Sequence, residues 1–194
     1  FLGALDQSFV CLHPTDTVPG LTFDPLSRKA SERLQAIKGR DPAKTFLGLV
    51  ADVYEAKRFW QELPAPWSRL LEDIWPAPLT VIWKANSRAP KVMVAEGGTL
   101  ALRVPQLPEH HAWFSDVLKQ FAYPLPSTSV NRSGFAAKEA WSQAAALVEG
   151  LDGAYVPDLS LGAGRPHQAT RPSTLIRIEN DGDFSVIREG AFSG

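Results

Sequence analysis

The sequence predicts an α/β fold in which helices flank a twisted, open, mixed β-sheet. Short apolar runs that read as buried strands alternate with segments in which apolar residues recur at helical spacing. Near the C-terminus, Thr174–Ile178 and Phe184–Arg188 are separated by Asn180–Asp183, which predicts an antiparallel hairpin and therefore a mixed sheet. No repeat or linker divides the 194 residues, so we expect one domain over residues 1–194.

The composition is that of an ordinary globular protein. The net charge is −1, so any anion-binding site must be a local patch rather than a basic surface. A single cysteine, Cys11, excludes an internal disulfide and a cysteine-rich metal site. No apolar stretch approaches the roughly 18 residues that span a bilayer, and we see no signal peptide. We therefore expect a cytoplasmic protein that does not bind a membrane.

The first third of the chain is predicted to hold two strands and a helix. SFVCLH, Ser8–His13, reads as a short buried strand. Ser27–Lys38 has apolar residues at helical spacing, Ser27 is a suitable N-cap, and Gly39 ends the helix. FLGLVA, Phe46–Ala51, predicts a second buried strand.

Two connections in this third carry side chains suited to polar ligands. PTDTVPGL, Pro14–Leu21, holds two threonines and a carboxylate and is either a plain loop or a binding loop. Lys38, Arg40 and Lys44 cluster where the helix passes to the next strand. A helix C-terminal cation complements the macrodipole, which accounts for Lys38 without a ligand. The macrodipole explains Arg40 and Lys44 less well, because they lie beyond the helix. The alternative is that the three cations belong to a basic loop that faces phosphate.

The middle of the chain is predicted to be helical and then β. Val53–Trp60 and Trp67–Trp75 predict helices whose tryptophans belong to the core, and Leu79–Trp83 predicts a strand. Ser87–Gly98 is polar and ends in two glycines, so we expect a mobile surface loop there. Glu109–Phe121 predicts an amphipathic helix.

Thr99–Pro105, TLALRVP, predicts a strand that contains a charge. Alternation puts Thr99, Ala101 and Arg103 on one face of the strand and apolar residues on the other. An unpaired guanidinium is too costly to bury, so Arg103 must face either solvent or an anion. The two alternatives are a solvated arginine on a surface strand and a binding site.

Pro124–Gly134, PLPSTSVNRSG, is dense in hydrogen-bonding side chains: Ser127, Thr128, Ser129, Asn131 and Ser133. The apolar residues just before it predict a short strand that ends in this cluster, which is how α/β folds present polar ligand sites. The alternative is a turn whose hydroxyls bond the local backbone.

No signature of covalent catalysis is present. The chain lacks HExxH, a nucleophile elbow and paired carboxylates, and the glycine-rich segment Ser160–Thr174 lacks the Walker pattern. Hydroxyls, an asparagine and isolated Arg and Lys residues recur at strand ends instead. These groups bind and polarise phosphates rather than attack a substrate.

Six motifs, in order, resemble the YrdC-type family: PTDTVPGL, the helix that ends in KGR, WPAPLT, LALRVP, STSVNRSG, and RPST followed by IREG. The match spans about Pro14–Gly190, and the Lys-Gly-Arg turn combined with Ser-x-Asn is specific to that family. The chain ends soon after IREG and so resembles the short, TsaC-like form. The resemblance implies a YrdC/RibB-like sheet around a large, concave, basic cavity.

The resemblance also implies an activity. It is that of a nucleotidyltransferase, L-threonylcarbamoyladenylate synthase, which makes threonylcarbamoyl-AMP and pyrophosphate from L-threonine, bicarbonate and ATP with Mg²⁺. The product serves threonylcarbamoyladenosine modification of tRNA. The implied partners are tRNA-modifying proteins of the TsaB, TsaD and TsaE type, and tRNA or double-stranded RNA.

Site residues carry over from the family by position. The ATP contacts match Lys38, Arg40, Lys44, Thr99, Ser129, Asn131 and Arg188, with charge stabilisation by Lys38 and Arg40. The threonine pocket matches Thr17, Arg103, Ser127 and Ser173. The planar guanidinium of Arg103 suits the amino-acid carboxylate. No residue is assigned as a nucleophile or as a metal ligand.

Four positions depart from the family pattern: Pro19 stands where an aromatic is usual, Asp41 where a proline usually follows the arginine, Thr45 where a proline is common, and Val130 where alanine is usual. A divergent YciO-like nucleotide-binding paralogue would also fit. A module that binds double-stranded RNA or tRNA is a further alternative, against which the net charge of −1 argues. The third alternative is a carbamoyl-transfer domain like that in hydrogenase maturation. The absence of acylphosphatase and zinc-finger segments from this sequence argues against it.

Overall fold

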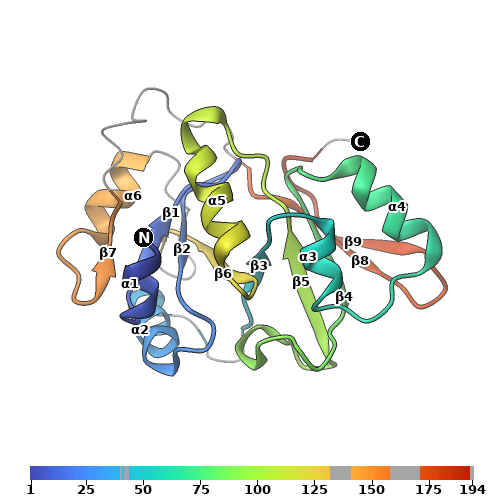
Figure 1. Cartoon of the computed structure of the whole chain (residues 1–194), viewed down its shortest axis with the longest axis horizontal. Helices are drawn as coiled ribbons and strands as arrows, with labels where there is room; N and C mark the ends of the chain where they lie inside the picture. Colours follow the sequence, from blue (N-terminus) through green and yellow to red (C-terminus); the bar gives the residue numbers. More distant parts are fainter. Residues whose placement is uncertain (40, 42–43, 132–140, 158–170, 193–194) are drawn as a thin grey trace.

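The computed structural model of the protein describes residues 1–39, 41, 44–131, 141–157 and 171–192. These residues form a nine-stranded mixed sheet of order β7-β1-β2-β6-β3-β5-β4-β8-β9, flanked by helices (Figure 1). The predicted α/β class and mixed sheet are confirmed.

The elements have the following bounds. The strands are β1 (Val10–His13), β2 (Gly20–Thr22), β3 (Leu47–Leu49), β4 (Leu79–Lys84), β5 (Thr99–Arg103), β6 (Leu125–Ser129), β7 (Ala154–Tyr155), β8 (Thr174–Ile178) and β9 (Phe184–Arg188). The helices are α1 (Leu2–Asp6), α2 (Arg28–Lys38), α3 (Val53–Lys57), α4 (Ala65–Ile74), α5 (Ala112–Gln120) and α6 (Trp141–Val148), with short 3₁₀ turns η1 (Lys91–Met93) and η2 (Glu109–His111). No helix among the described residues is both long and apolar enough to cross a bilayer.

Strand β6 joins the two halves of the sheet. It pairs antiparallel with β2 on one side and with β3 on the other. Strands β3 and β5, and β4 and β8, pair in parallel, whereas β8 and β9 form the predicted antiparallel hairpin. In Figure 1, α1, α2 and α6 gather around β1, β2 and β7, while α4 lies with β8 and β9 at the other end.

The side-chain period of two on each strand decides which helices it meets. On β1, Val10 and Leu12 belong to the apolar cluster shared with α2 and α6, whereas Cys11 belongs to the cluster shared with α1 and α5. The tryptophans Trp67 and Trp75 pack against β4 and β5 in a third cluster. They are core residues, as predicted.

Helix α2 begins and ends as the sequence predicts. The Ser27 hydroxyl accepts a hydrogen bond from the Ala30 amide at 3.2 Å, which satisfies one amide of the first turn. Gly39 follows the helix at φ 56°, in the left-handed region that favours glycine. The end of the helix therefore fixes where Lys38 lies.

Two loop predictions are wrong in part. β6 continues through Ser127 to Ser129, so these hydroxyls lie on the strand rather than beyond its end. Ser87–Gly98, expected to be a surface loop, contains η1 and buries Met93 with 1% exposure. Gly48 on β3 makes room for Met93, because a Cβ at Gly48 would lie 2.6 Å from the Met93 methyl group.

Candidate ligand-binding cavity

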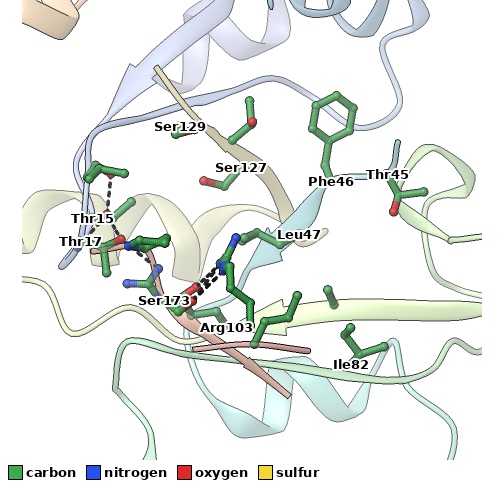
Figure 2. Close-up of a pocket in the computed structure, with 16 residues that line it drawn as sticks. Thr15, Thr17, Thr45, Phe46, Leu47, Ile82, Arg103, Ser127, Ser129 and Ser173 are labelled. Carbon is green, nitrogen blue, oxygen red and sulfur yellow. Dashed lines mark hydrogen bonds between the residues drawn. The ribbon is translucent and has the colours of Figure 1, made fainter. Parts of the chain in front are cut away.

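A cavity of about 400 Å³ opens over the middle of the sheet, a volume typical of small-molecule sites. Its lining combines residues of β3, β4, β5, β6, β8 and β9 with the segments around Thr15, Thr45 and Ser173 (Figure 2): Thr15, Thr17, Val18, Thr45, Phe46, Leu47, Ile82, Ala101, Arg103, Ser127, Thr128, Ser129, Pro172, Ser173, Leu175 and Arg188. Hydroxyls and guanidiniums dominate its polar part.

The strand period places these residues as the sequence predicts for β5. Ala101 and Arg103 line the cavity, whereas Leu100 and Leu102 are fully buried in the core. On the neighbouring strands, Leu47 of β3 lies directly opposite Ser127 of β6, and both line the cavity.

Arg103 is buried and paired, so the solvated alternative is wrong. Only 3% of its surface is exposed. One terminal nitrogen, Nη2, donates to Asp16 Oδ1, and the other, Nη1, donates to Thr17 Oγ1 at 3.2 Å. Asp16 is held in turn by the Gln106 amide, which donates to its Oδ2 at 3.1 Å. Arg103 Nε is also buried, and no acceptor among the described residues reaches it.

The charge of this region is positive. Burial and the nearby charge of Arg188 lower the pKa of Arg103 to about 9, while the Asp16 carboxylate favours the charged form. Arg103 is therefore protonated at neutral pH. Partial burial also lowers the pKa of Arg188. Two guanidiniums face one carboxylate here, which favours an anionic ligand.

Arg188 extends from β9 into the cavity and is held there by hydrogen bonds to Ser173. Its Nη2 donates to the Ser173 carbonyl at 2.8 Å and lies 3.4 Å from the Ser173 hydroxyl. The Ser173 hydroxyl also bonds the buried Thr80 hydroxyl at 2.8 Å. These contacts hold the second guanidinium against the floor of the cavity.

The threonine hydroxyls of PTDTVPGL form an ordered chain. Thr15 Oγ1 donates to the Val18 carbonyl at 2.8 Å, because a carbonyl can only accept. In the 3.0 Å contact between the Thr15 and Thr17 hydroxyls, Thr17 is therefore the donor. Thr17 Oγ1 accepts from Arg103, so its hydrogen bonds tie this segment to β5.

Lys38 lies against the Ser-x-Asn segment. Its ammonium, with 3% of the residue exposed, donates to the Ser129 carbonyl, to the Asn131 carbonyl at 2.9 Å and to Asn131 Oδ1 at 3.0 Å. The Ser129 hydroxyl donates to the same Oδ1 at 2.6 Å. Lys38 therefore does more than complement the helix dipole. Its hydrogen bonds also connect the end of α2 to the end of β6.

The structure brings some of the predicted site residues to the cavity and places others behind or beside it. Those that line the cavity are Thr17, Arg103, Ser127, Ser129, Ser173 and Arg188. Lys38 and Asn131 lie behind Ser129, and Lys44 is exposed beside Thr45, which lines the cavity. Thr99 begins β5, two residues before the lining begins at Ala101. Arg40 and Ser133 lie outside the described residues.

Sequence reasoning missed the partners of the lining residues. Asp16 pairs with Arg103, and His13 bonds Ser127. The need of a buried arginine for a carboxylate was a signal for Asp16, which stands in the loop PTDT. His13 gave no signal because it reads as the last residue of an apolar strand.

The sequence profile of the Sua5/YciO/YrdC family, described as telomere recombination, matches residues 3–190. The chain belongs to this family. The resemblance found from the motifs is thereby confirmed. A Chromohalobacter salexigens protein named threonylcarbamoyl-AMP synthase is 31% identical over 186 residues, covering 92% of this chain and 91% of the relative. A Halorhodospira halophila protein of the same name is 36% identical over 129 residues, covering 66% of this chain and 65% of the relative.

Solved structures of the family share the fold. Sua5 of P. abyssi, in complex with L-threonine, superposes with a TM-score of 0.79 at 23% identity, over 97% of this chain and 52% of that one. E. coli YciO gives a TM-score of 0.77 at 21% identity, over 99% of this chain and 88% of that one. The chain therefore spans about half the length of the Sua5 protein.

Proposed function

We propose that the protein is an L-threonylcarbamoyladenylate synthase, a nucleotidyltransferase that makes threonylcarbamoyl-AMP and pyrophosphate from L-threonine, bicarbonate and ATP. The observation that carries the proposal is a cavity in which the buried Arg103 and the partly buried Arg188 stand beside a row of hydroxyls. The relatives named threonylcarbamoyl-AMP synthase supply the support for the reaction itself.

Threonine binds, on this proposal, between Thr17, Arg103, Ser127 and Ser173. Arg103 takes the carboxylate, because each of its terminal nitrogens carries two N–H donors and, among the described residues, gives one to Thr17 or to Asp16. A carboxylate there would also offset the repulsion between Arg103 and Arg188.

ATP binds next to the threonine, towards the ends of α2 and β6. Ser129 and Arg188 line the cavity and are the proposed nucleotide contacts there. Lys38 and Asn131 hold the end of β6 behind Ser129. Lys44, Thr99 and Arg40 are the further nucleotide contacts proposed from the family pattern. The cations of Lys44 and Arg40 would neutralise the phosphates.

The reaction needs no protein nucleophile. The threonine amine combines with bicarbonate to form a carbamate and water. A carbamate oxygen then forms a bond to the α-phosphorus of ATP, and the bond from that phosphorus to the leaving pyrophosphate breaks. The protein contributes alignment of the reactants and fixed positive charge.

Mg²⁺ belongs to the proposal as part of the ATP substrate. Among the described residues, no three His, Cys, Asp or Glu side chains cluster to hold a metal ion. Mg²⁺ is commonly bound through substrate phosphates and water rather than by an all-protein cage. We also propose that the product passes to tRNA-modifying proteins of the TsaB, TsaD and TsaE type in the cytoplasm, and that residues 1–194 act as one domain.

The test is pyrophosphate release from ATP and Mg²⁺ with L-threonine, bicarbonate, both or neither. We expect release that needs both small substrates and falls at least about a hundredfold in Arg103→Ala, since a buried charged contact is lost. Gly3→Ala, at an open site in α1, serves as the unaffected control.

Two other outcomes would overturn the proposal. ATP binding without threonine-dependent release would indicate a divergent YciO-like paralogue. Absence of ATP binding, together with steeply salt-dependent binding of tRNA, would indicate the RNA-binding alternative.

A further inference from the structure

His13 is a buried histidine that touches a residue of the cavity. It ends β1, has 0% exposure, and stacks on Phe114 of α5 with ring centroids 4.9 Å apart at 16°. Its Nε2 lies 3.1 Å from the hydroxyl oxygen of Ser127, which lines the cavity. His13 itself is not among the residues of the lining.

The other ring nitrogen settles which atom carries the proton. His13 Nδ1 lies 3.0 Å from the Pro14 carbonyl oxygen, which can only accept, so Nδ1 is the protonated nitrogen. Burial and the positive charge of Arg103 lower the pKa of His13 to about 4, so the ring is neutral near pH 7. In a neutral imidazole the remaining nitrogen, Nε2, is an acceptor.

Because His13 Nε2 is an acceptor, the direction of its hydrogen bond with the Ser127 hydroxyl is determined. The Ser127 hydroxyl donates its one proton to His13 Nε2. Its oxygen can then offer only lone pairs to the cavity. Ser127 is thus a hydrogen-bond acceptor towards any ligand, although a serine that is free to rotate can act as donor or acceptor.

The surrounding backbone leaves room for this pair at Gly20. A Cβ at Gly20 would lie 2.4 Å from His13 Nε2 and 3.1 Å from the Ser127 oxygen. Gly20 pairs with His13 across β1 and β2 and with Ser129 across β2 and β6. The missing side chain on the middle strand is therefore what allows a residue of β1 to reach one of β6.

We propose that His13 is a positioning residue that holds Ser127 as an obligate acceptor, and that Ser127 in this state recognises the amine of the amino-acid substrate. The inference rests on the proposed function, because it takes an amino acid as the ligand. An amino acid carries its amine one atom away from its carboxylate. A cavity that holds the carboxylate at Arg103 needs acceptors, not donors, for the amine, and Ser127 is made one by His13.

The test compares two ligands that differ only at the amine. L-2-Aminobutanoate presents an ammonium donor, and 2-oxobutanoate presents a carbonyl acceptor on the same chain. Isothermal titration of the wild-type protein should show a preference for the amino acid of about tenfold or more, the range expected for a hydrogen bond to a charged group.

His13→Phe keeps a ring against Phe114 but removes the acceptor, so the Ser127 hydroxyl becomes free to donate. We expect the preference to shrink at least about threefold, and His13→Gln, which can offer a carbonyl oxygen, to restore part of it. Ser127→Ala should shrink the preference as well, and adding His13→Phe to Ser127→Ala should change it no further. Thermal unfolding of each variant verifies that it is folded.

A wild-type preference for the amino acid that His13→Phe leaves intact would overturn the inference. An unchanged preference in Ser127→Ala would overturn it even if His13→Phe does not fold. A change confined to the preference for L-threonine over L-2-aminobutanoate would contradict the amine assignment. Pyrophosphate release by the wild-type protein is measured in parallel, so that failure of the proposed function, which abolishes release, is told apart from failure of this inference, which does not.

Discussion

The cavity has an arginine wall, formed by Arg103 and Arg188, that carries two charges, and a serine wall, formed by Ser127 and Ser129, that carries none (Figure 2). Both walls depend on residues outside the cavity. Arg103 is paired with Asp16, and the hydroxyls of the serine wall donate to His13 and Asn131.

The two walls depend on their partners for different reasons. A buried guanidinium without a carboxylate is costly, so the partner of Arg103 is required for stability. A buried serine is neutral, and its hydroxyl can bond to either a donor or an acceptor. The partner of Ser127 therefore decides whether the hydroxyl offers a proton or a lone pair to the ligand. We therefore expect mutations behind the arginine wall to lower the free energy of unfolding most, and mutations behind the serine wall to lower it less and also to change ligand preference.

The largest expected effect is behind the arginine wall. Asp16→Ala leaves the buried Arg103 without its carboxylate and should lower the free energy of unfolding by about 3–5 kcal/mol. Urea denaturation measures this, and Asp116→Ala, which removes an exposed ion pair with Lys119, is the matched control with an expected loss of under about 1 kcal/mol. Equal small losses in both variants would contradict the difference between the walls.

A smaller effect is expected at Gly20, which lies against the contact between His13 and Ser127. Gly20→Ala would force its methyl group against His13 and should cost about 1–3 kcal/mol in overpacking. Gly3→Ala, in α1 where no described residue outside the local helix lies within 4 Å of the new methyl group, should cost nothing measurable. Thermal and urea unfolding of both variants decide the matter, and tolerance of Gly20→Ala at the wild-type level would show that His13 is not held in place.

The smallest expected effect concerns pH. The pKa of His13 falls from 6.5 to about 4 on folding, so between these values the unfolded chain binds more protons than the folded one. Stability should therefore decrease as the pH falls below 6.5, by about 1–2 kcal/mol between pH 6.5 and 5 from this residue. In His13→Phe that part of the loss should be absent. Urea denaturation at the two pH values measures the difference, and parallel losses in the two proteins would contradict the burial of a neutral imidazole.

The sequence predicted those features that depend only on neighbouring residues in the chain. The helix N-cap at Ser27, the left-handed Gly39 and the alternation on β5 are local, so they were predicted correctly. The motifs also carried the family and six of the cavity residues, because the motifs include the side chains that face the cavity.

The partners of those side chains were not predictable in the same way. His13 and Ser127 are 114 residues apart and on strands separated by β2, so only the sheet order brings them together. Ser87–Gly98 was misread as a surface loop because the burial of Met93 depends on the absent side chain of Gly48 in β3. The end of β6 was placed too early because serine and threonine are as suited to turns as to the face of a cavity.

The most direct test of the central claim is to follow labelled bicarbonate into the product. The protein is incubated with ATP, Mg²⁺ and L-threonine, and the nucleotides are separated and identified by mass. We expect an adenylate that contains both threonine and the bicarbonate carbon, formed in equal amount with pyrophosphate. Consumption of ATP with no labelled adenylate, or a labelled product that forms without threonine, would contradict it.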